Sequence, residues 1–497
     1  MANRAPPACR TLKQTGAWST AAAVLCSILA ACGGGSESAS VNVPVTDSRP
    51  PAQTGADAYQ YLQEYVAHGL HRSGTTGGNA VSGWVAEELR GMGYEVDSEA
   101  FAFEQFTPHT TRLHFVGDPV DKDVPVFPLY YSGRTGTEGI TAELVNVGNG
   151  ASLAIAGKNL TGKIVLASVA LVERAETPTL AGVLQGAAAA GAAGVVVAIQ
   201  GPQNLIVASN VNADTGLCGL PVLYVGKDDG AALAARSGQV ASFVLDADEM
   251  PGTSYNVVAT LPGSGDGILM IGTPVNGWFS TAAERGGGVG VLLTLARAIA
   301  EQYRDRVPPQ TVMFIASGGH EVGYLGLGRY AEAHPDLVKR IYTYLHLGAA
   351  VGGTLYAETP LDGTVAALPL VDPSRTLYVS ENPILLALAD LNAVSSGMIP
   401  FEELPPVLLD PGEQAQMYDR GVPIMSISGT TLYFHTENDL PDTTSAAILD
   451  PVVQTYSAIL RQLLALDPQL VRDANLAAGA LAGSPPAPAG CVVPKSS

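Results

Sequence analysis

The sequence predicts an α/β protein that carries an inserted β/α segment, and two observations support this fold class. From about Tyr255 to Leu466, apolar strand-like runs alternate with helical patterns, as in sheets that are covered by helices. Between Gly133 and Gly252 the chain instead has short runs rich in Val, Ile and Leu and the small-residue run "LQGAAAAGAAGVVVAI". We therefore expect two structural units, of which the second interrupts the first.

Composition is consistent with a large core and excludes one class of partner. The chain has 497 residues, of which 47% are hydrophobic, and this length suggests two or three domains. Its formal net charge is −20, from 26 basic and 46 acidic residues. Because phosphate binding needs clustered Lys and Arg, we expect no nucleic-acid partner.

The N-terminus is predicted to be a bacterial lipoprotein signal. Basic residues precede an apolar stretch at 21–31 that is too short to be a permanent transmembrane helix. It ends in "LAAC", which resembles the signal in which the cysteine, here Cys32, is acylated and becomes the first mature residue. An ordinary secretory leader is the alternative. The resemblance implies a lipid-anchored protein of the bacterial cell envelope, at the outer membrane or facing the periplasm.

Changes in composition divide the chain into predicted parts. These are a signal peptide (1–31), a flexible tether (32–55), an N-terminal part of the main domain (56–132), an insert (133–252), the C-terminal part of the main domain (253–470) and a disordered tail (471–497). Without the leader, Cys218 and Cys491 are the cysteines left besides Cys32. They could pair in an oxidising compartment.

Local patterns predict the first elements of both units. "ADAYQYLQEYVAHGLHR" has helical periodicity, a second helix is predicted near 79–92, and "YEVDSEAFAF" alternates as a strand does. Within the insert, "NLTGKIVLASVA" and "GLPVLYV" predict strands, and 186–199 predicts a small-residue helix that leads into a strand. These insert segments resemble a protease-associated domain. That resemblance implies a lid or a substrate-shaping role without catalytic groups.

Four segments of the main unit carry a second resemblance. They are "HRSGTTGGNAVSGWVAEELRGMGYEVDSEAF", "YNVVATLPGSGDGILMIGTPVNGWFSTAAERGGGVGVLLTLARAIAEQY", "QTVMFIASGGHEVGYLGLGRYAEAH" and "GVPIMSISGTTLYFHTENDLPDTT". In order and spacing they resemble the di-zinc exopeptidases, the group that contains bacterial leucyl aminopeptidase and glutamate carboxypeptidase. The resemblance covers nearly all of residues 56–470. It implies a mixed sheet flanked by helices, with the protease-associated segment as an insert.

The stretch "SGGHEVGYLG" begins like a His-Glu-x-x-His zinc helix, but Tyr324 stands in the place of the second histidine. A strand-like run at 312–316 and then glycines precede His320. The pair His320–Glu321 is therefore predicted in a strand-to-helix loop at the carboxyl edge of the sheet, where ligands usually gather. The resemblance identifies it as the family's pair of acids with the first acid replaced.

Some positions of the implied two-zinc site carry no ligand. The family's His-x-Asp falls on Thr273, Pro274 and Val275, and a later aspartate falls on Gly348 or Ala349. Neither Thr273 nor Val275 can replace an imidazole or a carboxylate ligand. The resemblance therefore implies that a two-zinc centre is lost.

At the positions of the other zinc's ligands, this sequence still has residues of metal-binding type. Glu284 falls on the bridging carboxylate, Glu321 on the second acid of the pair, and His435 of "YFHTEND" on the final histidine. Two carboxylates, one imidazole and a water would resemble a catalytic zinc site with an open position. His320 stands where the general base stands and could accept a proton. We expect one zinc ion at this trio, or none.

Other residues are candidates for the pocket, and a metal-free site stays open as an alternative. Arg285 replaces the usual asparagine, and its guanidinium could neutralise the glutamates in place of a metal. His346, if it lies on a strand, could reach the place that the later aspartate has vacated. Trp278 and Tyr433 are candidates for the walls of the cleft. Histidines outside these motifs, such as His71, are expected at the surface or in turns.

Two functions remain. The first is a cell-envelope lipoprotein with an aminopeptidase-like fold, a degenerate two-zinc site and a peptidase activity that is lost or strongly altered. The alternative is an active single-zinc aminopeptidase or amidohydrolase. Missing ligands favour the first, and surviving ionisable groups favour the second, because an abandoned pocket needs none of them. The expected partners are a peptide or small amide ligand and, through the lipid, a membrane.

Overall fold

The computed structural model describes residues 53–475 apart from 119–121, 152–154, 156–157, 172–174, 176, 216, 218, 360–363 and 406–411. The predicted signal peptide, Cys32 with the tether up to residue 52, and the predicted Cys218–Cys491 pair lie outside the described residues. Within the described part, none of the helices has the length and apolar character needed to cross a membrane.

A mixed sheet forms the main unit, as the sequence predicts. Its strands, in spatial order, are β14 (Glu402–Leu404), β13 (Thr376–Val379), β15 (Ile424–Ser428), β10 (Ile341–Leu347), β8 (Ile268–Pro274), β9 (Thr311–Ser317) and β7 (Val240–Leu261), with β1 (Glu95–Phe115) paired to β7. Strands β15, β10, β8 and β9 are parallel, whereas β7 is antiparallel to β9 and β13 to β15. Every residue of β8, β9 and β10 is buried, which is why these strands are nearly continuous apolar runs.

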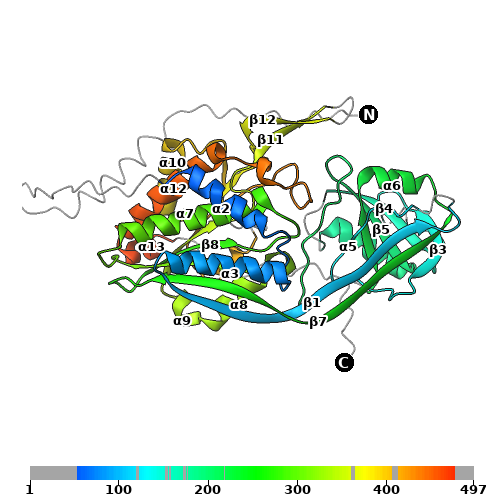
Figure 1. The fold of residues 1–497 in the computed structure, drawn as a ribbon, viewed down its shortest axis with the longest axis horizontal. Coiled ribbons are helices and arrows are strands. Elements are labelled where there is room, and N and C mark those ends of the chain that lie inside the picture. Colours follow the sequence, from blue (N-terminus) through cyan, green and yellow to red (C-terminus); the bar gives the residue numbers. More distant parts are fainter. Residues whose placement is uncertain are drawn as a thin grey trace, which may run out of the picture. The chain divides into compact units, whose positions relative to one another are not determined.

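Helices cover both faces of this sheet (Figure 1). One face packs against α2 (Gly55–Ala67), α3 (Thr76–Gly91), α7 (Gly287–Gln302), α10 (Pro383–Ser395), α12 (Ala446–Leu464) and α13 (Pro468–Asp473). The other packs against α8 (Leu325–Ala333), α9 (Pro335–Val338) and α11 (Ala415–Tyr418). The period of two along β8 explains the division, because Leu269 and Ile271 face the first layer and Ile268 and Met270 the second.

The predicted N-terminal helices are confirmed as α2 and α3, and α13 continues three residues into the predicted tail. Helix α2 begins after Thr54, whose backbone N–H donates to the Asp57 carboxylate at 3.0 Å, so the start of the helix is capped by its own sequence. Strand β1 is longer than the predicted segment.

The insert has its own apolar core and continues the same sheet beyond β7. Its elements are β3 (Ile140–Asn146), β4 (Ile164–Ala170), β5 (Gly194–Gln200), β6 (Val222–Val225), β2 (Phe127–Pro128), α5 (Pro178–Ala189) and α6 (Lys227–Ala234). The predicted strands are present as β4, β5 and β6, but α5 begins earlier than the sequence suggested. Strand β7 crosses the predicted boundary at residue 252, and Figure 1 shows it beside β1 along its length. Assignment of the insert to the protease-associated family stays a prediction.

Smaller elements complete the described chain. They are a two-stranded sheet of β11 (Thr354–Glu358) and β12 (Val365–Val371), and the short helical turns η1 (Ala282–Gly286), η2 (His320–Val322) and η3 (Pro441–Thr443). The turns η1 and η2 follow β8 and β9, where the candidate site lies.

Candidate functional site

The candidate site lies at the carboxyl edge of the parallel strands. Strand β8 is followed by the π-helical turn η1 with Glu284, and β9 by the 3₁₀ turn η2 with Glu321. His435 lies in the loop between β15 and η3 and has a left-handed backbone, with φ of 57°. Parallel strands bring their carboxyl ends to one edge, so three residues far apart in sequence meet there. The predicted strand-to-helix loop around His320 is confirmed.

Asp439 joins the loop of His435 to the turn of Glu284. Its carboxylate accepts hydrogen bonds from the backbone N–H groups of Ala283 and Glu284, both at 2.9 Å, and from the Thr443 hydroxyl at 2.6 Å. These contacts satisfy backbone donors that a short helical turn leaves without partners. Asp439 therefore positions a candidate ligand without itself pointing to the candidate metal site.

Glu284, Glu321 and His435 form the candidate metal site. The His435 Nε2 atom lies 3.3 Å from Glu284 Oε1 and 3.7 Å from Glu321 Oε2, and all three side chains are at most 4% exposed. One possible ligand atom from each residue lies within 4.8 Å of the others. Zinc bonds of about 2.0–2.2 Å in a tetrahedral site place ligand atoms roughly 3.3–3.6 Å apart. The separation between His435 and Glu284 lies within that range, and the separation between His435 and Glu321 is slightly longer.

Unpartnered atoms in this trio point to a cation. Glu284 Oε1, Glu321 Oε2 and His435 Nε2 are buried and have no hydrogen-bond partner among the described residues. His435 Nδ1 lies 2.9 Å from the Ala208 carbonyl oxygen, so Nδ1 carries a proton, and when a cation is bound the neutral ring would direct the Nε2 lone pair at it. Since buried polar atoms normally have partners, the donor set fits one zinc ion.

Arg285 supplies a positive charge to the same carboxylates. Its Nη2 atom lies 2.6 Å from Glu321 Oε1 and 3.1 Å from Glu284 Oε1, and its Nε donates to the Asn276 carbonyl at 3.2 Å. Burial would raise the pKa of Glu284, but His435 and Arg285 outweigh burial and lower that pKa. Burial would lower the pKa of His435, but Glu284 raises it above its ordinary value. A protonated His435 together with Arg285 would thus neutralise both carboxylates, so the metal-free alternative is also physically complete.

A second zinc does not fit the residues present. The Thr273 hydroxyl donates to the Leu347 carbonyl at 2.7 Å, and Val275 is an apolar, fully buried side chain. At Gly348, an added Cβ would lie 3.1 Å from Cε1 of His346. The His346 ring therefore occupies the space beside Gly348, one of the two residues on which the family's later aspartate falls.

Glu413 is a site residue that the sequence did not indicate. It is fully buried, accepts a hydrogen bond from the Ser317 hydroxyl at 2.6 Å, and has its Oε2 3.0 Å from His320 Nδ1. His346 Nε2 lies 3.5 Å from the other oxygen, and His346 Nδ1 is 2.8 Å from the Ser426 hydroxyl. Burial would raise the pKa of Glu413, but its contacts with His320 and His346 lower it to about 2.

Two residues that the sequence singled out belong to this cluster. His346 lies on β10, as expected, with its ring beside Gly348, and it contacts Glu413 and Ser426. His320 likewise directs Nδ1 at Glu413. No motif surrounds Glu413, and its partners are 93 and 96 residues away, so neither periodicity nor spacing could have identified it.

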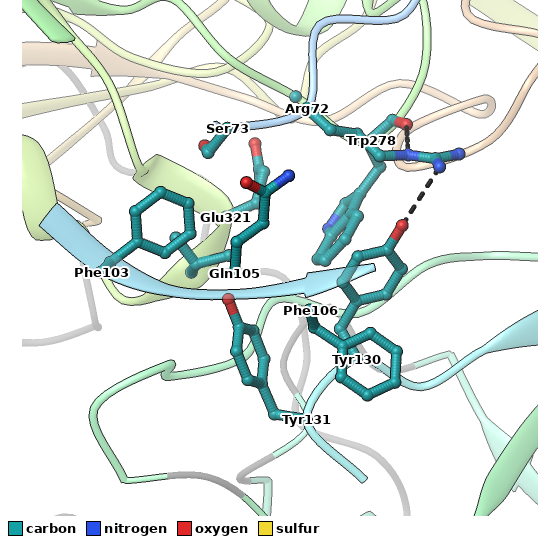
Figure 2. Close-up of a pocket in the computed structure, with 11 residues that line it drawn as sticks. Arg72, Ser73, Phe103, Gln105, Phe106, Tyr130, Tyr131, Trp278 and Glu321 are labelled. Atoms are coloured by element: carbon teal, nitrogen blue, oxygen red, sulfur yellow. Dashed lines mark hydrogen bonds between the residues drawn. The ribbon is translucent and has the colours of Figure 1, made fainter. Parts of the chain in front are cut away.

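A small pocket opens beside Glu321 (Figure 2). Arg72 crosses its rim, where Nε donates to the Trp278 carbonyl at 2.9 Å and Nη1 to the Tyr130 hydroxyl at 3.1 Å. Five of the eleven lining residues are aromatic, and aromatic walls suit an apolar group. The lining residues are Arg72, Ser73, Phe103, Gln105, Phe106, Tyr130, Tyr131, Gly277, Trp278, Glu321 and Val322.

Of the residues that the sequence suggested for the walls of the cleft, one lines this pocket and one does not. Trp278 lines it, as expected, whereas Tyr433 does not and instead packs on Tyr356 with ring centres 5.0 Å apart. Arg285 is not among the lining residues and instead contacts Glu284 and Glu321. The expectation for His71 was wrong, because its side chain is fully buried against Tyr65, whose carbonyl lies 2.9 Å from His71 Nε2.

The insert contacts the site through backbone groups. The Ala208 N–H donates to the His435 carbonyl at 3.0 Å, and the Val211 N–H donates to the Glu321 carbonyl at 3.0 Å. Between them, Asn210 accepts a hydrogen bond from the Trp278 indole at 2.9 Å. One insert segment thus holds two residues of the zinc trio and one wall of the pocket.

Comparisons with known proteins agree with this architecture. Residues 256–356 match the model of peptidase family M28. An aminopeptidase found in two strains of Pseudomonas aeruginosa is 26% identical over 334 residues, which are 63% of this chain and 60% of that protein. The chain therefore matches less than two thirds of the length of these relatives.

Solved structures share the fold. A zinc aminopeptidase from Bacillus subtilis has a TM-score of 0.67 at 19% identity, over 83% of this chain and 95% of the other. A peptidase M28 precursor from Shewanella amazonensis SB2B has a TM-score of 0.65 at 20% identity, over 84% and 94% of the two chains. The mixed sheet with flanking helices is thus the fold of these proteins.

Proposed function

We propose that this member of the zinc-exopeptidase family, with its peptidase family M28 domain, is a cell-envelope lipoprotein with strongly altered peptidase activity. The two-zinc mechanism is lost, and one zinc ion serves hydrolysis of a peptide or a small amide. The convergence of Glu284 Oε1, Glu321 Oε2 and His435 Nε2, all buried and without a hydrogen bond among the described residues, carries this proposal. Lipid attachment at Cys32 is proposed from the sequence alone.

Glu284, Glu321 and His435 would hold the zinc, which supplies a water of lowered pKa and polarises a carbonyl oxygen. Other residues provide what a hydrolase needs around that chemistry. The aromatic pocket beside Glu321 takes the apolar part of a substrate, and His320, next in sequence to Glu321, is the candidate proton acceptor. The insert segment with Ala208 and Val211 holds the backbone of the two ligands that it touches.

A second candidate function is a non-catalytic binding lipoprotein that keeps the cleft for recognition. The contact of Arg285 with both glutamates favours it, because a guanidinium and a protonated His435 can neutralise the site without metal. The two candidates differ in zinc content and in turnover.

The test uses the purified mature protein. We expect one zinc ion per chain by elemental analysis and slow turnover of a panel of aminoacyl amides and short peptides. Glu321→Gln should abolish both, and Glu332→Gln, at an exposed position, serves as the matched control. Protein without zinc and without turnover would instead establish the binding function, and two zinc ions per chain would contradict the loss of the second site.

A further inference from the structure

We propose that Glu413 is a positioning residue that orients His320 as the proton acceptor of this site. The inference rests on the proposed hydrolytic function and adds the residue that makes a histidine usable in place of the family's acid. Glu413 accepts at both oxygens, Oε1 from Ser317 and Oε2 from His320 Nδ1. No motif in the sequence assigns it a role.

Hydrogen bonding to Glu413 selects one tautomer of His320. A carboxylate only accepts, so the 3.0 Å contact requires a proton on Nδ1, and in the neutral ring the lone pair then lies on Nε2. His320 Nε2 makes no hydrogen bond to the part of the chain that the structure describes. The Tyr324 ring stacks edge-on at 4.7 Å and limits rotation of the imidazole. In the hydrolytic step, Nε2 accepts a proton from the attacking water as the water oxygen bonds to the amide carbon. It returns that proton to the amine nitrogen as the C–N bond breaks.

The position of Glu413 is itself fixed from three strands. Ser317 ends β9, His346 lies on β10 and Ser426 on β15, and through them Glu413 is tied to the carboxyl edge of the sheet. A fully buried carboxylate is costly unless it is paired, so this arrangement persists only because all of its partners are in place.

The same network occupies the part of the site that lacks zinc ligands. The Ser317 hydroxyl also approaches the Thr273 carbonyl at 3.3 Å, and the His346 ring lies beside Gly348. Thr273 and Gly348 are the positions where the family's ligands for the second zinc are missing. A carboxylate–imidazole pair thus stands where the second cation's ligands would be, which gives His320 a fixed negative partner.

The test compares Glu413→Gln with the exposed control Glu332→Gln in the zinc-loaded protein. We expect Glu413→Gln to lower kcat by roughly 100-fold or more, with KM for the amide nearly unchanged, because an oriented general base contributes to the transition state alone. A second readout needs no turnover: ¹⁵N NMR of histidine-labelled protein, with His320 assigned by substitution, reports the ring tautomer. Wild-type protein should hold the proton on Nδ1, and Glu413→Gln should give a mixture.

The outcomes separate this inference from the proposed function. Suppose that the protein has no amidase activity, but that His320 carries its proton on Nδ1 in the wild type and loses this preference in Glu413→Gln. The positioning role of Glu413 then stands, and the hydrolytic function fails. If wild-type His320 carries its proton on Nε2, the inference is overturned, and this measurement needs no variant to fold. Loss of stability in Glu413→Gln with an unchanged tautomer and unchanged kcat would assign Glu413 a structural role only.

Discussion

Replacing Arg285 with leucine tests whether this guanidinium compensates the buried carboxylates. The side chain is 1% exposed, and its Nη2 contacts Glu321 at 2.6 Å and Glu284 at 3.1 Å. Removing one partner of a buried ion pair typically costs about 3–5 kcal/mol, because the remaining charge is left without compensation. We therefore expect Arg285→Leu to lower the free energy of unfolding by about that amount in zinc-free buffer.

Zinc should restore part of this loss, since the cation would replace the guanidinium as the partner of both carboxylates. At a free zinc concentration of about 100 times Kd, binding to the folded state alone adds about 2.7 kcal/mol. Urea unfolding followed by circular dichroism, with and without zinc, measures both effects. Arg329→Leu is the matched control, because Arg329 is 45% exposed and an exposed ion pair is worth only about 0–1 kcal/mol. Equal stability of the two variants, or no response of Arg285→Leu to zinc, would refute the reasoning.

Three further predictions concern other parts of the chain. Burial lowers the pKa of His71 to about 4. Below about pH 6.5 the unfolded chain therefore binds a proton at this residue that the folded chain does not bind until about pH 4, so the free energy of unfolding falls as pH falls. His71→Phe should remove about 2 kcal/mol of the difference in unfolding free energy between pH 8 and pH 5, and an unchanged difference would argue against a neutral buried imidazole. Asp439→Ala should weaken zinc binding about 10–100-fold in a competition titration, since it frees the Glu284 turn; wild-type affinity would show that the turn holds without it. Cys32→Ser should release the protein from the membrane fraction and abolish labelling by fatty acid, and labelling that persists would exclude Cys32 as the lipid site.

Sequence patterns were sufficient to predict the helices and strands whose buried faces show as a local pattern of apolar residues. Strands β8, β9 and β10 are buried on both faces and appear as continuous apolar runs, and α2 and α3 have clear helical periodicity. The approach of Glu284, Glu321 and His435 to one another was predicted from the order and spacing of the motifs that resemble the family. Those motifs lie after strands that end at one edge of the sheet. Their approach within 4.8 Å agrees with that prediction, and zinc binding itself stays a proposal.

Long-range side-chain contacts could not be predicted in the same way. Glu413 meets Ser317 and His320 only because the chain returns to the edge of the sheet about a hundred residues later, and no local pattern records that return. His346 was placed correctly on its strand, but its contact with Glu413 depends on side-chain packing that the sequence does not show. His71 was expected at the surface because a lone histidine in a turn-rich stretch shows no sign that Tyr65 will cover it.

The central claim is that one cation position survives and the other is lost. Anomalous diffraction at the zinc edge, from crystals of the mature protein grown with zinc, tests it most directly. We expect a single peak at bonding distance, about 2.0–2.2 Å, from one atom each of Glu284, Glu321 and His435. A second peak beside Thr273 and Gly348, or a strong peak away from this trio, would contradict it.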